Sequence, residues 1–260
     1  MKKVVIITGA SSGIGLATAN FLTDKGYTVY GISKAEFASE KFKHYNCDVC
    51  DTNQMSEIFK QIYEKEHQID ILINNAGMGI SGAVEYIKKR DLDIIFDVNI
   101  KAVIMLSGLA LPYLRETKGK IINISSVAAP ISIPYQACYS ATKSAIESFS
   151  KALANEVKSQ KIKVCCVRPG DTKTGFTANR IKTEVENDVY GKKITKSVKK
   201  MEKDEQNGTP PVKVSKLIYK MAKRKNPPLT VTVGLGYKTL CLLAKFLPTK
   251  FVNYIVGKLY

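Results

Sequence analysis

Short apolar runs alternate with longer helical segments along the first two thirds of the chain, and this alternation restricts the fold more than any other feature. The runs are continuously apolar, which is typical of strands buried on both faces of a parallel sheet. Strands are predicted at Val4–Ile7, Thr28–Ile32, Ile69–Ile73, Lys120–Ile124 and Ile162–Val167. Helices are predicted at Gly15–Lys25, Asn53–Glu66, Arg90–Leu114 and Ser140–Ser159. Strand-helix-strand units of this length predict an α/β fold, a doubly wound parallel sheet with helices on both faces.

The pattern weakens after Pro169. Residues 171–211 are polar, rich in lysine and interrupted by glycines, so we expect a substrate-covering excursion with short helices. A helix at Val212–Lys223 and a last strand at Leu229–Val233 follow. Residues 237–260 form two amphipathic pieces that Pro248 divides, which predicts a C-terminal helical extension. With 260 residues, 45% of them hydrophobic, we expect residues 1–260 to form a single domain.

The net charge of +17 is concentrated near the C-terminus, where residues 191–260 hold 16 Lys and Arg against three acids. A basic face attracts an anionic substrate or phospholipid headgroups, although a solvated lysine-rich surface explains the same composition. No nucleic-acid-binding motif accompanies the charge, so no nucleic-acid partner is expected.

The N-terminus and the cysteines indicate a cytoplasmic protein. The apolar run from Val4 ends at Thr8-Gly9, too early for a signal peptide, and no run approaches the roughly 18 apolar residues that span a bilayer. The six cysteines are too scattered for a disulfide framework. One C-x-x-C pair, Cys47 and Cys50, has no second pair to complete a metal site, so no metal is predicted.

A glycine-rich turn follows the first predicted strand and opens the first predicted helix. The segment contributes Gly9, Ser11, Ser12, Gly13, Ile14 and Gly15. Glycines allow the tight turn and let backbone N–H groups approach a phosphate, whose charge the helix N-terminus stabilises. The position in a strand-helix unit predicts a dinucleotide site on a single Rossmann-type sheet.

The spacing Thr-Gly-x-x-x-Gly-Ile-Gly resembles that of the short-chain dehydrogenase/reductase family, and five further motifs extend the resemblance to Thr174. They are Asn74-Asn75-Ala76-Gly77, Asn99 in Asp97-Val98-Asn99, Ser125-Ser126, Tyr139-x-x-x-Lys143, and Pro169-Gly170 with Thr174. Their order and spacing match the family over roughly two thirds of the chain. The resemblance implies an oxidoreductase that moves a hydride between a nicotinamide cofactor and a ketone or secondary alcohol.

The resemblance assigns the catalytic roles to Asn99, Ser126, Tyr139 and Lys143. Tyr139 and Lys143 share one helix face, and the ammonium, together with the positive charge of the oxidised nicotinamide, is expected to lower the phenol pKa from about 10 towards the working range. Tyr139 then exchanges a proton with the substrate oxygen, which Ser126 polarises; Ser125 is the alternative. Lys143 also binds the nicotinamide ribose, and Asn99 holds a water that links Lys143 to solvent.

Ser33 and Lys34 follow the second strand, where an NAD enzyme carries an acid for the ribose hydroxyl. A hydroxyl and an ammonium suit a 2′-phosphate, so NADP(H) is favoured over NAD(H). The resemblance places Asp48 and Val49 at the adenine and Asn75, Ala76 and Gly77 at the adenosine. It places Pro169, Gly170, Thr172 and Thr174 towards the nicotinamide, where Tyr139 and Lys143 also contact the cofactor.

The apolar segment within Val127–Gln136 predicts a hydrophobic substrate. The sequence around Pro169–Phe176 and the apolar tail resemble the hydroxysteroid dehydrogenase and acyl-dihydroxyacetone-phosphate reductase-like branch. A hydroxysteroid or bile-acid-like substrate, with an anionic group attracted by lysines, is the first expectation. A lipid-like ketone such as acyl-dihydroxyacetone phosphate, or a non-catalytic NADP-binding sensor, is the alternative.

Two surfaces are expected to have partners. The family resemblance implies a homodimer or homotetramer through the Arg90–Leu114 and Ser140–Ser159 helices. The apolar residues of 237–260 need cover, which the protein core, a second subunit or a membrane surface can supply.

Overall fold

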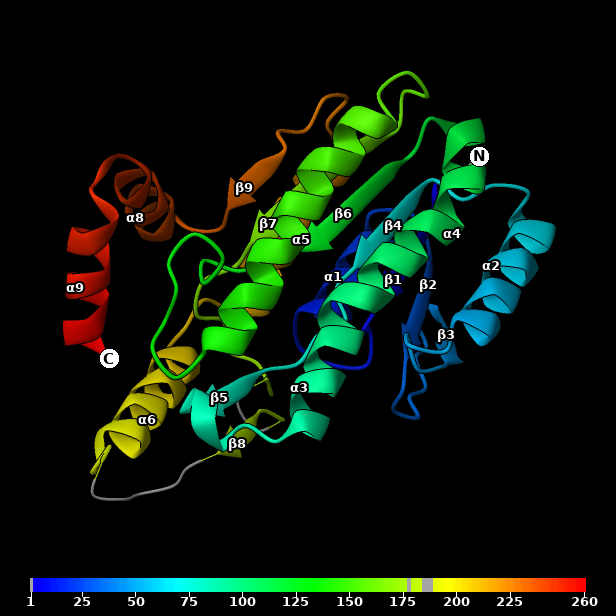
Figure 1. Cartoon of the computed structure of the whole chain (residues 1–260). Helices are drawn as coiled ribbons and strands as arrows, with labels where there is room; N and C mark the ends of the chain where they lie inside the picture. Colours follow the sequence, from blue (N-terminus) through cyan, green and yellow to red (C-terminus); the bar gives the residue numbers. More distant parts are fainter. Residues whose placement is uncertain (1, 177–178, 184–188) are drawn as a thin grey trace.

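The computed structural model describes residues 2–176, 179–183 and 189–260, and its centre is a parallel sheet (Figure 1). Within these residues the sheet has the strand order β3-β2-β1-β4-β6-β7-β9. The strands are β1 Val4–Thr8, β2 Thr28–Ser33, β3 Lys43–Asn46, β4 Ile71–Asn74, β6 Lys120–Ile124, β7 Lys163–Arg168 and β9 Thr230–Thr232. The reversal of strand order beside β1 and β4 opens a crevice at the carboxyl ends of the strands, where α/β sheets bind ligands.

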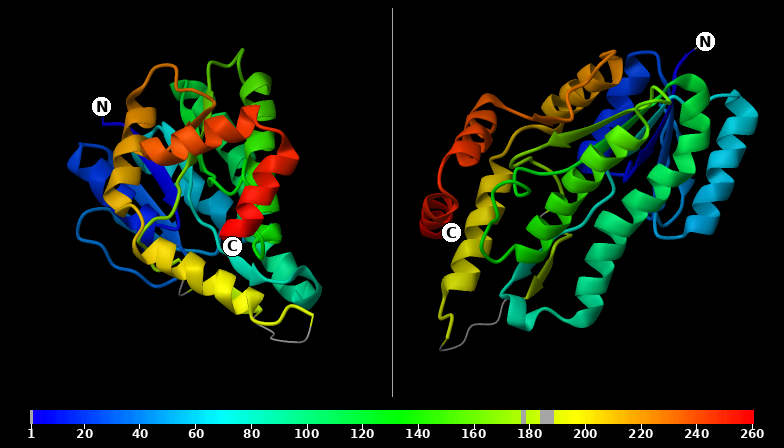
Figure 2. Two further views of the ribbon diagram at one scale, coloured as in Figure 1. Left: turned by 90° about the vertical axis from the view of Figure 1, so that its left-hand side faces the viewer. Right: turned by 45° about the horizontal axis from the view of Figure 1, so that its top comes forward.

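Helices cover both faces of this sheet (Figures 1 and 2). They are α1 Gly13–Asp24, α2 Thr52–Glu66, α3 Lys89–Phe96, α4 Ala102–Thr117, α5 Ala137–Glu156, α6 Lys193–Gln206, α7 Pro211–Lys223, α8 Leu235–Phe246 and α9 Thr249–Leu259. The predicted α/β class, the six predicted strands and the alternating helices are confirmed, with ends that differ by a few residues.

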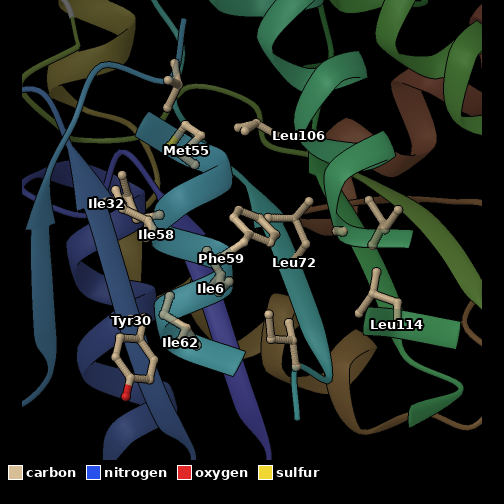
Figure 3. Packing of buried hydrophobic residues seen from close by; sticks show 14 of the residues in the cluster. Ile6, Tyr30, Ile32, Met55, Ile58, Phe59, Ile62, Leu72, Leu106 and Leu114 are labelled. Atoms are coloured by element: carbon tan, nitrogen blue, oxygen red, sulfur yellow. The ribbon is translucent and has the colours of Figure 1, made fainter. Parts of the chain in front are cut away.

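Alternate residues of β1 reach opposite layers of the core. Val4 and Ile6 lie in a buried cluster with side chains of α2, α4 and α5, whereas Val5 and Ile7 pack with those of α1 and α7. Figure 3 shows the first cluster, where Phe59 of α2 lies among strand and helix side chains. Burying one such side chain contributes about 1.5–3 kcal/mol to the stability of the fold. This packing holds β1 in place and therefore positions the crevice at its carboxyl end.

Three short strands escaped the sequence prediction. β3 is an edge strand whose residues are all partly or fully exposed, so it lacks a continuous apolar run. β5 (Ile80–Gly82) and β8 (Ile181–Thr183) pair in a separate parallel sheet beneath the crevice and are three residues long each. A strand of three residues is too short to show the alternation of apolar and polar residues that predicts a strand.

The predicted helix Arg90–Leu114 is observed as a longer helical stretch with an interruption. A π-helical turn at Asp97–Lys101 separates α3 from α4 and contains the buried Asn99. The stretch Lys89–Thr117 is the one helix in the described chain that is long and apolar enough to cross a membrane, judged by length and composition alone. Core helices pass the same test, and Leu106, Ala110 and Leu114 of this stretch pack into the core.

The region after β7 forms the excursion and the tail that were predicted. Residues 171–211 contain β8 and α6, although 177–178 and 184–188 lie outside the described residues. Pro248 separates α8 from α9, which lie at the margin of the molecule beyond β9 (Figure 1). These two helices form the expected C-terminal helical extension.

Candidate active site

The glycine turn after β1 is shaped by contacts that leave no room for side chains. Gly9 has φ +68°, and a Cβ there would lie 2.9 Å from Ala76 Cα. A Cβ on Gly15 would lie 2.0 Å from the carbonyl oxygen of Gly9. Helix α1 begins at Gly13, so its first N–H groups face the crevice without intrahelical partners.

The Asn75–Gly77 segment is tied to this turn by hydrogen bonds. Thr8 Oγ1 accepts from the backbone N–H groups of Asn75 and Ala76, each at 3.0 Å. The Asn75 side-chain amide donates to the carbonyl oxygens of Thr8 at 2.9 Å and Gly9 at 3.2 Å. These bonds hold the loops after β1 and β4 together as the floor of the crevice, a role of Thr8 that the motif spacing did not indicate.

Two adjoining cavities share this floor. Both are lined by Gly9, Ser11, Ala76 and Gly77. The first also contains Ser12, Gly13, Ile14, Asn75, Ser126, Tyr139, Lys143, Pro169, Gly170, Thr172 and Thr174. The second also contains Ser33, Lys34, Asp48 and Val49. Gly15 lines neither cavity and supports Gly9 from behind.

The residues present fit an NAD(P) molecule. The glycine turn lies where the two cavities meet, so it can hold a pyrophosphate with one nucleoside on each side. Ser33, Lys34, Asp48 and Val49 would hold the adenosine half, and Tyr139, Lys143, Thr172 and Thr174 the nicotinamide half. When bound, the nicotinamide supplies or accepts the hydride.

Three of the four predicted catalytic residues, Ser126, Tyr139 and Lys143, line the first cavity, and the buried Asn99 lies behind its wall, bonded to Met78. Tyr139 and Lys143 come from the first turns of α5, Ser126 from the end of β6, and Asn99 from the π-helical turn. Ser126 hydrogen-bonds the Tyr139 hydroxyl. Lys143 Nζ lies 5.7 Å from the Tyr139 ring centroid and donates to the carbonyl oxygen of Ile124 at 3.0 Å.

Asn99 supports this arrangement from beneath. Its side-chain oxygen accepts from the N–H of Met78, and its amide donates to the carbonyl oxygen of Met78, both at 2.9 Å. A Cβ on Gly77 would lie 3.2 Å from Asn99 Oδ1 and 3.5 Å from Lys143 Nζ, so both polar groups approach the same stretch of backbone. The π turn re-aims Asn99 towards the site, a common use of such turns.

The structure separates the two serines that the sequence left as alternatives. Ser125 is buried and donates to Glu147 Oε1 at 2.9 Å, and Glu147 also forms an ion pair with Arg168. Both serines line the first cavity, but only Ser126 hydrogen-bonds the Tyr139 hydroxyl. The Ser125 hydroxyl is therefore engaged between β6 and α5, and Ser126 is the serine whose hydroxyl contacts Tyr139.

The expected lowering of the Tyr139 pKa is not observed. Burial raises the pKa of Tyr139 to about 12, and the hydrogen bond from Ser126 offsets only part of this effect. Burial lowers the pKa of Lys143 to about 8. Desolvation is the largest cause for both groups, so Tyr139 holds its proton at neutral pH, while Lys143 remains largely charged.

Several cavity residues on the substrate side were not found from the sequence. The Phe176 ring lies 5.7 Å from that of Tyr139, and the buried Arg180 pairs with Glu205 of α6. Met201 and Tyr260 complete this side. A signal for Glu205 existed: it continues the stripe of buried residues on α6, where an acid is unusual.

The residues for cofactor choice already have partners in the protein. Lys34 Nζ lies 2.9 Å from Asp48, and the Lys34 side chain is 81% exposed. Ser33 is buried, and its hydroxyl lies 2.6 Å from His44 Nε2. Lys34 can therefore turn towards a 2′-phosphate at little cost, whereas Ser33 is less free than predicted.

Comparison with known proteins agrees with this geometry. The sequence model of the family described as short chain dehydrogenase matches residues 3–185. The chain belongs to the short-chain dehydrogenase/reductase family. This family consists of oxidoreductases that act on keto and hydroxyl groups with NAD(H) or NADP(H).

Individual relatives within the family differ in what they cover. A 3-ketodihydrosphingosine reductase of Bacteroides thetaiotaomicron is 40% identical over 99% of this chain and 98% of its own. A 3-oxoacyl-(acyl-carrier-protein) reductase of Thermotoga maritima is 33% identical over 67% of this chain and 76% of its own. A short-chain dehydrogenase structure from Streptomyces avermitilis has a TM-score of 0.83 and 28% identity, and covers 100% of this chain and 95% of its own.

Proposed function

We propose that this short-chain dehydrogenase uses NADPH to reduce the carbonyl group of a long-chain lipid ketone of the 3-ketodihydrosphingosine type. One observation carries the substrate class: the similarity to the Bacteroides reductase extends over the whole chain. It therefore includes the substrate side after residue 185, where the match to the family model ends. The apolar residues within Val127–Gln136 and Phe176 suit a hydrocarbon chain.

The chain's own groups suit the direction of reduction. Tyr139 carries its proton at neutral pH, so it can donate that proton as negative charge develops on the carbonyl oxygen. Ser126, beside Tyr139, can donate a hydrogen bond to the same carbonyl oxygen and polarise the carbonyl group. The charged Lys143 beneath them stabilises the phenolate that remains after proton transfer.

The preference for NADPH over NADH is part of the proposal. Lys34 lines the adenosine-side cavity. The end of β2 is occupied by Ser33 and followed by Lys34, so no carboxylate stands at this position. A 2′-phosphate has a charge close to −2 and competes with the single carboxylate of Asp48 for the Lys34 ammonium.

The hydroxysteroid expectation and the sensor alternative stay predictions that a substrate panel separates. Turnover of long-chain 3-keto amines and acyl ketones above that of steroid and bile-acid ketones supports the lipid assignment. Tight NADPH binding with no turnover of any ketone supports the sensor.

Assembly through α4 and α5 also belongs to the proposal. Ile104 and Met105 of α4 are 41% and 48% exposed, so this helix presents apolar surface outside the described core. Sedimentation equilibrium that gives one subunit mass at micromolar concentration contradicts the expected homodimer or homotetramer.

The decisive experiment is Tyr139→Phe. The substitution removes the proton donor and keeps the ring against Phe176, so kcat for ketone reduction is expected to fall about 10²–10⁴-fold. NADPH affinity, measured by fluorescence titration, stays within about threefold because the glycine turn is untouched. Ser125→Ala is the matched control, since it removes a neighbouring hydroxyl that donates to Glu147 and does not contact Tyr139. Unchanged turnover of the Tyr139 variant rules out this mechanism.

A further inference from the structure

The C-terminal helices α8 and α9 hold most of the exposed apolar surface of the molecule. Ten of the sixteen exposed large apolar side chains in the described chain lie between residues 235 and 259. They are Leu235, Leu240, Leu242, Leu243, Phe246, Leu247, Phe251, Tyr254, Ile255 and Leu259. Scattered apolar residues are normal on a protein surface, but a concentration of this kind marks an interaction site.

The inward faces of both helices are already used for packing. On α8, Tyr237, Cys241 and Ala244 follow helical spacing and contact the domain. On α9, Val252 and Val256, with Tyr260 just beyond, do the same. The exposed side chains belong to the other faces, so the core of this chain does not cover them.

The charge of the segment identifies the partner. Residues 235–260 contain Lys238, Lys245, Lys250 and Lys258 and no acidic residue. In a two-fold symmetric dimer through this surface, each lysine set would face an identical set without counter-charges. Apolar residues among lysines suit a lipid surface that offers hydrocarbon and anionic headgroups together.

The surface also adjoins the substrate cavity. Tyr260 lines the cavity that contains Tyr139, and it packs in the same cluster as Ile131, Cys241 and Val256. Figure 2 shows α9 running from the end of α8 towards the part of the molecule that contains α6. A surface that touches lipid would therefore lie next to the cavity proposed to hold an apolar substrate.

We propose that the exposed faces of α8 and α9 dock this enzyme on an anionic lipid bilayer surface. The apolar side chains enter the headgroup region and the four lysines contact acidic phospholipids. This inference goes beyond the proposed function, because docking requires neither turnover nor a particular ketone.

Vesicle flotation of the full chain tests the proposal. Binding to vesicles that contain phosphatidylglycerol is expected to exceed binding to pure phosphatidylcholine vesicles at least about tenfold, with each lysine contributing about fivefold. The double variant Leu243→Glu and Phe251→Glu is expected to lose at least about tenfold in binding to the anionic vesicles.

A matched control variant separates location from added charge. Leu243 and Phe251 are 51% and 49% exposed, and Val212 and Leu229, outside these helices, are 44% and 49% exposed. Val212→Glu with Leu229→Glu adds the same charge and is expected to bind vesicles within about twofold of the unchanged chain. Equal loss in both double variants overturns the assignment to α8 and α9.

A lysine variant tests the electrostatic part of the proposal. The double variant Lys245→Gln and Lys250→Gln removes no apolar surface, and it is expected to weaken anionic-vesicle binding while it keeps the melting temperature.

Two results overturn the proposal as a whole. The first is the absence of flotation of the unchanged chain with either vesicle type. The proposal is also overturned if the Leu243 and Phe251 double variant has a different assembly mass from the unchanged chain and no vesicle binding is seen. That result assigns the surface to a second copy of this chain. Ketone reduction measured in the same samples shows separately whether the proposed function fails.

Discussion

The cofactor side and the substrate side of the crevice are built by different means. Around Gly9, Gly15 and Asn75, backbone contacts and main-chain hydrogen bonds fix each position so tightly that one added methyl group collides. Around Arg180, Glu205 and Tyr260, side chains of α6 and of the tail make the contacts. The first kind of site leaves a sequence motif because few residue types satisfy it, whereas the second allows many side chains and leaves little trace.

Exchanging one glycine of the cofactor side and one of the C-terminal tail tests this comparison with the largest expected effect. Gly15→Ala puts a Cβ into the carbonyl oxygen of Gly9, so NADPH affinity is expected to fall at least about 100-fold and stability by about 1–3 kcal/mol. Gly257→Ala in α9 meets no atom within 4 Å and is expected to add about 0.5 kcal/mol. Titration with NADPH and thermal unfolding measure both. Equal loss in the two variants would break the distinction between the two regions.

The pH dependence of reduction sharpens the account of the buried catalytic pair. Lys143 has a lowered pKa of about 8, so its positive charge disappears as the pH rises through that value. At saturating NADPH, kcat is expected to fall roughly tenfold between pH 7 and pH 9. A flat profile over this range contradicts the role of the Lys143 charge.

Lys120 supplies the control for this profile. Its pKa is also lowered to about 8 by burial, but it lies at the opposite end of β6 from Ser126. A lysine whose folded pKa is lowered destabilises the fold when charged, so rising pH through 8 to 10 increases the stability that Lys120 contributes. Lys120→Met is expected to keep the pH profile of kcat. In the unchanged chain, the titration of Lys120 is not expected to lower the melting temperature between pH 7 and pH 9.

Lys34→Ala tests the cofactor preference with a smaller expected effect. The Michaelis constant for NADPH is expected to rise about fivefold and that for NADH to remain within about twofold, because only NADPH carries the 2′-phosphate. Lys41→Ala is the control, since Lys41 forms a similarly exposed ion pair with Asp24. Identical changes for both cofactors would remove the basis for the NADPH assignment.

The smallest expected effect concerns the joint between the tail and the crevice. The Tyr237 hydroxyl donates to Asp171 Oδ2 at 2.5 Å, and its ring packs on Gly170. Tyr237→Phe keeps the ring and is expected to cost about 1 kcal/mol, or about 2–4 °C in melting temperature. Tyr254→Phe on the exposed face of α9 is the control, and it is expected to change neither the free energy of unfolding nor the melting temperature. A larger loss in Tyr254→Phe would show that the outer face is structurally required.

The difference between the two regions also explains what the sequence could predict. Strands buried on both faces have continuous apolar runs, so β1, β4, β6 and β7 were found close to their observed ends. The edge strand β3 faces water and was missed for the same physical reason. Asn99 was placed at the site by its motif, but the π turn that aims it has no sequence signal that was recognised.

The substrate side was predicted only as a segment. The apolar loop before α5 and the excursion after Gly170 were expected to line the pocket, and both do. Arg180 and Glu205 were not foreseen, because their pairing depends on how α6 folds back over the crevice. Burial raises the pKa of Tyr139 in the protein without cofactor, an effect that the sequence could not show because it gives neighbouring charges but not the depth of burial.

The position of Tyr260 has a practical consequence for handling this protein. Its ring forms part of the wall of the reaction chamber, with the Lys200 ammonium 5.1 Å from the ring centroid. Residues appended after Tyr260, such as an affinity tag, start beside that wall and are positioned to obstruct it. The N-terminus emerges at the opposite end of the molecule (Figure 1), so a fusion partner placed there leaves the chamber accessible.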